Sequence, residues 1–198
     1  MERKNEYFTG ERRMRTVGTE FTTREDGEAL IIEGYFAVFN SNYEIGPGMS
    51  ESIDRHAFDS TLGGDIRALT NHDTTLVLGR TTVKTLELRT DERGLWGRIV
   101  INPKDTDAVN LYERVRRGDV NQCSFGFSIR EEEIEFFDDE SVHWTIKDVE
   151  LYEVSCCTFP AYEETSISAR TAQRDDLKKR KADAWREQMR VKLTGGAG

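Results

Sequence analysis

From Leu30 onward the chain alternates short apolar runs with turn residues. The runs are LIIEGYFAVF, DIRALT, TLVLGRT, TLELRT and GLWGRIVI, with Gly63-Gly64 and TDERG among the turns between them. Short runs rich in β-branched and aromatic side chains, bounded by turn residues, are typical of β-strands. Polar turns that connect successive strands favour antiparallel pairing. The pattern therefore predicts a mostly antiparallel β fold.

One segment has helical spacing instead. Its apolar residues are Ala108, Leu111, Tyr112 and Val115. Asp105 or Thr106 is suited to cap the start of this helix, and Gly118 to end it. A shorter helix is expected over residues 54–62, DRHAFDSTL.

The two ends of the chain differ from its β-rich middle. Residues 1–27 are polar and irregular, so we expect a flexible N-terminal arm, followed by a folded domain over residues 28–170. Beyond it, four apolar residues share one helical stripe: Ala182, Trp185, Met189 and Leu193. We expect residues 171–198 to form a basic amphipathic C-terminal tail helix that docks on a partner or on the protein's own surface.

Charge and cysteine content narrow the class of protein. The formal net charge of −9 argues against a general nucleic-acid binder, although REEEIEFFDDE is acidic and the C-terminal segment is basic. There are three cysteines, and no apolar stretch follows the polar start. This is typical of a protein of the reduced cytoplasm. No run reaches the length of a membrane span, so no membrane association is expected.

The segment NQCSFGFSIR, residues 121–130, predicts a strand with one nearly bare face. Its bulky face carries Phe125, Phe127 and Ile129, and its small face carries Ser124, Gly126 and Ser128. A strand can be small on one side because another backbone packs there or because a ligand must approach closely. Ser124 is therefore either a filler residue or a nucleophile.

A nucleophilic serine needs a base and a group that orients the base. His72 follows an apolar run, at a strand end where catalytic and binding residues often lie. In DVELYEVS, Glu153 shares a face with Val149 and Leu151, where an apolar residue is expected. A histidine that becomes cationic would offset the cost of burying this carboxylate. Alternatively, a bulge turns Glu153 toward solvent, and Glu150 is then the candidate carboxylate.

Other chemistries have weaker candidates. Cys123 precedes Ser124 and is an alternative thiolate nucleophile, but its position on the apolar face is typical of a small hydrophobic residue. His56 and His143 are interpreted as structural or surface residues. None of the three histidines has another at metal-ligand spacing, and no glycine-rich phosphate loop follows a strand. No metal or other cofactor is expected.

Six segments, taken in order, resemble the prohead maturation proteases of tailed bacteriophages. They are EGYFAVFN, RHAFDSTL, IRALTNHD with VLGRT, GLWGRIVI, VRRGDVNQCSFGFSI and VELYEVSCCTFPAYEETSI, which together cover about residues 30–170. This family is similar to the herpesvirus assembly proteases. The resemblance implies an α+β, mainly β fold: a mostly antiparallel β-barrel with surrounding helices, formed here by a serine protease domain over residues 28–170.

The resemblance also implies roles for individual residues. The family's NHD segment falls on His72 as general base, its SFGF segment on Ser124 as nucleophile, and its EVS segment on Glu153 as the orienting residue. The herpesvirus relatives use a second histidine in the third role, so His143 is a rival. For the oxyanion hole we expect backbone N–H donors. The segment Arg116–Gly118 either neighbours that hole or only complements the C-terminus of the preceding helix.

The function implied is that of a phage head maturation serine endopeptidase. Its expected substrates are the scaffolding segment of the major capsid protein and the protease itself, inside the assembling procapsid in the host cytoplasm. Dimerisation is a further expectation from the relatives. The main alternative is a non-catalytic capsid assembly or scaffolding module that binds through the basic tail. A second alternative is a hydrolase of the same fold acting on a small ester.

Overall fold

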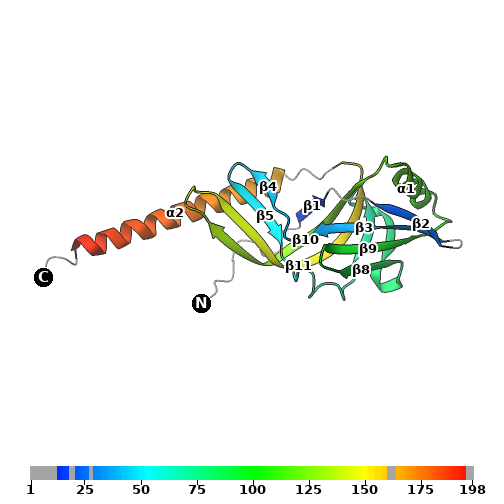
Figure 1. Ribbon diagram of the computed structural model, residues 1–198, viewed down its shortest axis with the longest axis horizontal. Helices are drawn as coiled ribbons and strands as arrows, with labels where there is room; N and C mark the ends of the chain where they lie inside the picture. Colours follow the sequence, from blue (N-terminus) through cyan, green and yellow to red (C-terminus); the bar gives the residue numbers. More distant parts are fainter. Residues whose placement is uncertain (1–12, 18–20, 27–28, 160–163, 195–198) are drawn as a thin grey trace. The chain divides into compact units, whose positions relative to one another are not determined.

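The computed structural model describes residues 13–17, 21–26, 29–159 and 164–194 of the 198-residue chain. The chain divides into two compact units, Met1–Glu163 and Glu164–Gly198. The described part of the first unit is mainly β with one α-helix, and that of the second unit is a single helix (Figure 1). The chain is thus an α+β protein rich in β-structure, as predicted.

The elements follow one another along the chain in this order: β1 (Arg13–Val17), β2 (Thr22–Asp26), β3 (Ala29–Val38), β4 (Tyr43–Gly46), β5 (Met49–Ile53), β6 (Arg67–Thr70), β7 (Asp73–Arg80), the 3-10 turn η1 (Thr81–Val83), β8 (Leu86–Thr90), β9 (Gly94–Ile101), α1 (Thr106–Arg117), β10 (Gln122–Phe136), β11 (Val142–Cys157) and α2 (Glu164–Thr194).

The described strands form two sheets. The seven-stranded sheet has the order β1-β10-β11-β5-β4, and β6 joins it by pairing with both β11 and β7. The four-stranded sheet has the order β2-β3-β9-β8. All pairs are antiparallel except β11–β5 and β11–β6, which are parallel. The prediction of a mostly antiparallel fold is confirmed.

A closed barrel is not found among the described strands. The larger sheet ends at β1, β4 and β7, and the smaller one ends at β2 and β8, so both sheets are open. The antiparallel hairpins were predictable from local patterns, whereas barrel closure requires pairing between strands distant in sequence. The likeness of the fold to herpesvirus proteases stays a prediction.

Strands β10 and β11 organise the larger sheet. They form a long antiparallel hairpin, visible as the green and yellow strands of Figure 1. The first part of β11 pairs with β5, and its last part pairs with β6. Because β6 and β7 are consecutive and antiparallel, the turn between them lies beside the end of β11.

The main core contains residues from both sheets and from α1. Phe36 and Ile99 come from the smaller sheet, Phe125 and Val154 from the larger one, and Leu111 from α1, and all are buried. The rings of Phe125 and Phe127 stack with centroids 4.8 Å apart. The bulky face of the 121–130 segment therefore anchors β10 in the core, as its pattern predicts.

Of the two helices predicted in the first unit, the structure contains one. α1 is confirmed: the Asp105 side chain accepts hydrogen bonds from the N–H groups of Asp107 and Ala108, and Gly118 caps the other end with φ 84°. Such an N-cap is worth about 1 kcal/mol. The prediction of a helix over residues 54–62 is wrong. This segment forms successive turns, held mainly by three-residue bonds such as Ala57 N–H to Asp54 and Asp59 N–H to His56.

The terminal segments also differ from their sequence patterns. Where an irregular arm was expected over residues 1–27, β1 pairs with β10 and β2 pairs with β3. α2 begins at Glu164, before the expected start at residue 171, and Trp185 and Met189 on the predicted stripe are exposed. The side chain of Leu193 lies outside the described residues. Among the residues that the structure describes, no helix combines the length and apolar character needed to cross a bilayer.

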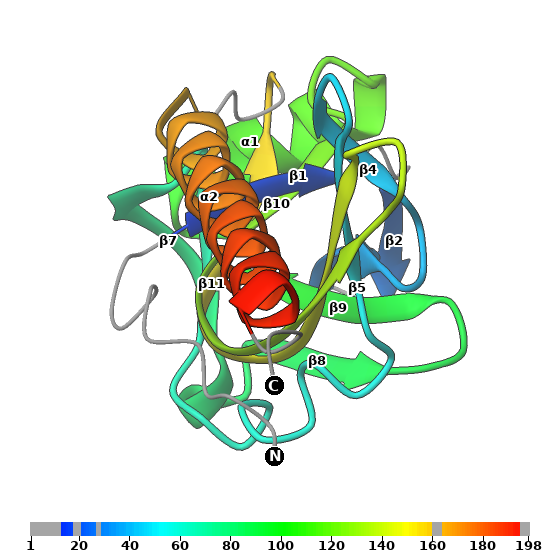
Figure 2. The same ribbon diagram turned by 90° about the vertical axis from the view of Figure 1, so that its left-hand side faces the viewer.

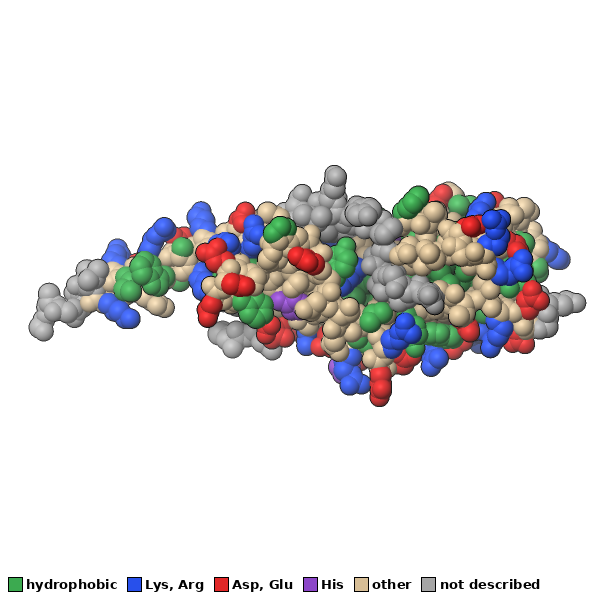
Figure 3. All heavy atoms as spheres, turned by 45° about the horizontal axis from the view of Figure 1, so that its top comes forward, with side chains coloured by type: hydrophobic (Ala, Val, Ile, Leu, Met, Phe, Trp, Pro, Cys, Tyr) green, Lys and Arg blue, Asp and Glu red, His purple; other side chains and the backbone are tan. Residues whose placement is uncertain are grey.

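The acidic segment of the sequence lies at the β10–β11 hairpin. Glu133 and Glu135 are exposed on β10, and Asp138, Asp139 and Glu140 are exposed in the turn. On the face shown in Figure 3, acidic (red) and basic (blue) side chains are mixed over the end of the first unit that carries α1. The hairpin is therefore the most concentrated acidic segment of the chain.

Candidate active site

Three adjacent strands form the floor of the candidate site. In the antiparallel register, Ser124 of β10 lies opposite Ser155 of β11 on one side and opposite Thr16 of β1 on the other. Residues directly opposite each other in a sheet present their side chains on the same face. The small face of β10 therefore adjoins the face of β11 that carries Ser155, and by period two also Glu153 and Cys157.

A tight turn positions His72. Asn71 and His72 form a two-residue loop between β6 and β7, and both have positive φ, 49° and 62°. This is the pattern of a type I′ hairpin turn, which asparagine tolerates better than histidine. Asn71 anchors the turn to the residue after β11: its Oδ1 accepts a hydrogen bond from the Thr158 N–H at 2.9 Å. The His72 N–H donates to Ser155 Oγ at 3.3 Å.

His72 and Glu153 form a buried pair. His72 Nδ1 lies 2.7 Å from Glu153 Oε1, and the side chains are 15% and 2% exposed. The other carboxylate oxygen, Oε2, accepts a hydrogen bond from Ser155 Oγ at 2.6 Å. These bonds hold the carboxylate in place and favour the histidine tautomer with a proton on Nδ1. Nε2 is then left as the basic nitrogen.

The carboxylate predicted from periodicity is indeed buried. Glu153 is 1% exposed, so the alternative in which a bulge turns it toward solvent is wrong. Glu150 instead pairs with Arg130 at 3.4 Å, and its side chain is 47% exposed. Of the two carboxylates, only Glu153 contacts His72 in the described structure.

Ser124 is fully buried and its hydroxyl is already engaged. Its Oγ donates a hydrogen bond to the backbone carbonyl of Arg15 in β1 at 2.8 Å. His72 Nε2 instead faces Cys157 Sγ at 3.7 Å. Within the described residues, the structure therefore joins His72 to Glu153 but does not join Ser124 to His72 by a hydrogen bond.

The three cysteines differ in their surroundings. Cys123 is buried in the core beside Phe125, as its position on the apolar face predicts. Burial, together with the nearby Glu153 carboxylate, raises the pKa of the Cys157 thiol to about 12. Burial also raises the pKa of Cys156. Because its pKa is this high, Cys157 is a neutral thiol beside His72 at neutral pH. Neutral thiols are poor nucleophiles.

The other two histidines lie in other surroundings. His143 is on β11, ten positions before Glu153, and its ring nitrogens lie 2.8 Å from Ser50 Oγ and 2.8 Å from Ser52 Oγ of β5. His56 is exposed and pairs with Asp59 at 2.9 Å. The structure brings neither of them into contact with Ser124 or His72.

The segment considered for the oxyanion hole forms local contacts. Arg116 pairs with Glu113 of the same helix at 2.6 Å, and Arg117 pairs with Asp119 at 3.4 Å. Both arginine side chains are more than half exposed. These contacts fit the reading in which the arginines complement the C-terminus of α1.

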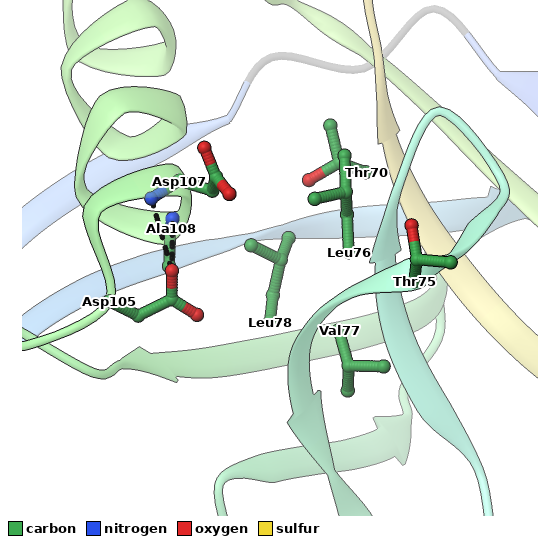
Figure 4. A pocket seen from close by; sticks show the side chains of 8 residues that line it. All are labelled: Thr70, Thr75, Leu76, Val77, Leu78, Asp105, Asp107 and Ala108. Atoms are coloured by element: carbon green, nitrogen blue, oxygen red, sulfur yellow. Dashed lines mark hydrogen bonds between the residues drawn. The ribbon is translucent and has the colours of Figure 1, made fainter.

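A small pocket lies between β7 and the start of α1. Its volume is about 140 Å³, and Leu76 and Leu78 of β7 line it opposite Asp105 and Asp107 (Figure 4). Figure 4 also shows Asp105 engaged with the helix N-terminus by two hydrogen bonds. Pockets for organic cofactors usually exceed about 300 Å³, so this pocket does not fit one.

Sequence reasoning missed two parts of the site. Ser155 and Cys157 follow Glu153 at period two on β11, so strand periodicity could have placed them on the same face. Strand β1 was not predicted, because Arg13 and Arg15 gave its segment a polar pattern. Both arginines are buried near Glu51 of β5, a partner distant in sequence.

Comparison with known proteins adds an independent finding. Residues 19–180 match the family model described as caudovirus prohead serine protease. Over 155 residues the chain is 32% identical to the prohead protease of Enterobacteria phage HK97, across 76% of this chain and 64% of that protein. The chain therefore spans less than two thirds of that relative's length. It is also similar to the capsid assembly protease gp21 of bacteriophage T4, with 10% identity and a TM-score of 0.49 over 74% of this chain and 96% of that one.

Proposed function

Because this chain belongs to the caudovirus prohead serine protease family, we propose that it is a serine endopeptidase that acts through Ser124, His72 and Glu153. The observation that carries this assignment is the 2.7 Å contact between His72 Nδ1 and Glu153 Oε1. Glu153 is buried on the sheet face that also carries Ser124. A buried carboxylate that orients a histidine beside a serine is the arrangement that serine-based acyl transfer requires.

The reaction begins with proton transfer from the serine. Ser124 Oγ turns from the Arg15 carbonyl toward His72 Nε2, which accepts its proton as Oγ attacks the substrate carbonyl carbon. Glu153 stabilises the imidazolium that forms. The Cys157 thiol lies next to Nε2, and its high pKa keeps it from competing with Ser124 as the nucleophile.

The second half of the reaction reverses the direction of proton transfer. The imidazolium protonates the leaving amine, and an acyl-enzyme on Ser124 remains. Water then attacks this ester with His72 again as the base, which frees the carboxylate product and restores the serine. Backbone N–H groups are the expected donors to the oxyanion in both steps.

The proposed substrates are the scaffolding segment of the major capsid protein and the protease itself. The proposed place of action is the inside of the assembling procapsid, in the host cytoplasm. The family's description, caudovirus prohead serine protease, and the name of the HK97 relative, prohead protease, support this setting. Self-association as a dimer belongs to the same proposal.

Co-expression with the capsid protein of the same phage tests the function. Mass spectrometry of both proteins should show trimmed capsid protein with the wild-type chain and intact capsid protein with Ser124→Ala. Ser128→Ala is the matched control, because Ser128 lies on the same strand and is also buried, with its Oγ bonded to the Tyr152 hydroxyl at 3.2 Å.

The result separates the enzyme from a non-catalytic assembly module. If Ser124→Ala still trims the capsid protein, the serine assignment is wrong. If neither the wild type nor the Ser128→Ala control trims it, the endopeptidase proposal is wrong and the non-catalytic assembly module is favoured. Circular dichroism of each variant shows whether the fold is retained.

A further inference from the structure

Strand β1 lies where an extended peptide would bind beside the nucleophile. It lies beside β10 (Figure 2) and pairs with it antiparallel over Arg13–Val17. Arg15 is opposite Phe125, and Thr16 is opposite Ser124. Adding a strand to an open sheet edge is a common way for proteins to bind extended peptides. Because β11 occupies the other side of β10, β1 covers the one edge of β10 that a peptide could approach next to Ser124.

One backbone carbonyl of β1 touches the nucleophile. Ser124 Oγ donates to the Arg15 carbonyl oxygen at 2.8 Å, so the Arg15–Thr16 peptide bond is adjacent to the reactive hydroxyl. Attack on this carbonyl requires the hydroxyl to turn its hydrogen toward His72 while the backbone of β1 keeps its place. The contact places the hydroxyl next to this carbonyl group, on the side from which Ser124 reaches β1.

The Arg15 side chain lies against one acidic and one aromatic residue. Its Nη1 donates to Glu51 Oε1 at 3.2 Å, and its Nη2 donates to the Glu51 carbonyl at 3.4 Å. The guanidinium also lies over the Tyr43 ring, 5.0 Å from its centroid. Tyr43 and Glu51 are opposite residues of the β4–β5 pair, so they lie side by side.

The charge at this contact is selective. Glu51 and Arg15 are both buried, and Arg13 lies 4.0 Å from the other carboxylate oxygen of Glu51. A neutral side chain in place of Arg15 would remove the shorter ion pair of this buried carboxylate, and an acidic side chain would add repulsion between like charges, so a basic residue is favoured here.

We propose that β1 occupies the substrate site, that Arg15–Thr16 is a cleavage site of the chain, and that Glu51 selects a basic residue on the amino side of the cleaved bond. The inference rests on the proposed serine protease function. It names the substrate class of that site: extended segments with arginine or lysine before the cut.

The cleavage follows ordinary acyl transfer. Ser124 Oγ forms a bond to the Arg15 carbonyl carbon, the bond from that carbon to the Thr16 nitrogen breaks, and the serine proton passes through His72 to the Thr16 amine. Water then hydrolyses the ester, which releases residues 1–15 with a new carboxylate and restores the hydroxyl. Until β1 departs, it keeps other substrates from Ser124.

The test uses the full chain and measures its own N-terminus. Intact-mass and N-terminal sequencing should find a species that starts at Thr16 in the wild type and none in Ser124→Ala. Arg15→Lys should keep this cut, and Arg15→Glu should slow it by about tenfold or more, since a buried charge pair is broken. Arg24→Glu is the matched control, because Arg24 is an exposed arginine of β2.

Synthetic peptides test selection on a substrate that is separate from the enzyme. A peptide with the sequence of residues 10–20 should be cut between the positions of Arg15 and Thr16. Its Arg15→Glu form should be cut more slowly by about tenfold or more. In Glu51→Arg the preference between these two peptides should reverse. Equal rates for both peptides with the wild-type enzyme would overturn the inference, whether or not Glu51→Arg folds.

A further measurement does not depend on proteolysis. In the inactive Ser124→Ala chain, adding Arg15→Glu should speed hydrogen exchange of the amides in residues 123–127, because β1 loses its anchor. Unchanged exchange would overturn the role of Glu51.

The outcomes distinguish failure of this inference from failure of the proposed function. Ser124-dependent trimming of the capsid protein without any cut between Arg15 and Thr16 would overturn this inference and leave the proposed function standing. Without any Ser124-dependent cleavage, both fail.

Discussion

Gly126 lies directly across from Glu153 in the β10–β11 pair, and a Cβ atom at Gly126 would overlap the Glu153 carboxylate. The nearly bare face of β10 therefore has a specific cause at this position. The missing side chain leaves the space in which the carboxylate reaches His72. A strand that carried a bulky residue there would displace the group that orients the base.

Gly126→Ala tests this relationship. The added methyl group should displace the Glu153 carboxylate and lower kcat/KM by about 100-fold, the effect expected of a small misplacement of catalytic groups. It should also cost about 1–3 kcal/mol of unfolding free energy through overpacking. Kinetics on a peptide substrate and urea denaturation measure the two effects.

Gly63→Ala is the control for this substitution. No atom lies within 4 Å of a Cβ at Gly63, so the change should leave activity unaltered. Full activity in Gly126→Ala would contradict the steric role of the glycine.

Glu153→Gln should lower kcat by about four orders of magnitude if the triad follows the serine-protease template. The amide would donate to Nδ1 and favour the tautomer that carries its proton on Nε2, which cannot accept the serine proton. Single-turnover kinetics measure this loss, and circular dichroism checks the fold. Glu150→Gln serves as the comparison, since Glu150 contacts Arg130 rather than His72. A larger loss in Glu150→Gln, or in His143→Ala, would reassign the third residue.

Cys157 should be unreactive in the folded protein. Burial and the nearby Glu153 raise its pKa to about 12, so little thiolate is present at pH 8 and iodoacetamide should label it only after denaturation. Cys157→Ala should retain peptidase activity. Alkylation of the native protein that proceeds in step with loss of activity would instead identify a thiol nucleophile, a role open to Cys123 or Cys157.

The stability of the His72 hairpin should depend on pH through Asp65. Arg80 donates two hydrogen bonds of 2.6 Å to this carboxylate and lowers its pKa to about 2, with Arg67 acting in the same direction. A lowered pKa in the folded state stabilises the protein above the unfolded value of 3.8, and this contribution disappears as the pH falls through about 2. Asp65→Asn should therefore lower the thermal midpoint at pH 6, and the difference from wild type should shrink toward pH 2.

The control for the pH experiment is Asp26→Asn. Asp26 is exposed on β2, and its contact with Arg24 is 3.9 Å long. A difference between wild type and Asp65→Asn that stays constant from pH 6 to pH 2 would show that the Asp65 contacts contribute through something other than its charge.

Strand periodicity was sufficient to predict part of the site. Period two placed Ser124 on the small face of its strand and Glu153 among buried positions, because both lie in regular strands whose other face is buried in the core. It could not predict the left-handed turn at Asn71 and His72, since this pair lacks the glycine that usually marks a type I′ turn. The hydrogen bond between His72 and Glu153 depends on this turn and on the β6–β11 pairing, which joins segments distant in sequence.

Local patterns failed where a distant partner decides the structure. Arg13 and Arg15 make their segment appear solvent-exposed, yet both lie buried against the Glu51 carboxylate inside the protein. Residues 54–62 have helical spacing, but the Asp54 side chain accepts a bond from the His56 N–H and is held by Lys147 at 2.6 Å. These contacts favour a sequence of turns over a continuous helix.

The pairing of β1 with β10 also bears on how the protein can be handled. An uncovered strand presents a row of unsatisfied N–H and C=O groups to which another chain can add, and native proteins avoid such edges. β1 is itself an edge strand, but it has only five residues, and short edge strands are one way in which proteins limit such pairing. In a preparation that lacks residues 1–17 the edge would move to the longer β10, and we expect that preparation to aggregate more readily at high concentration.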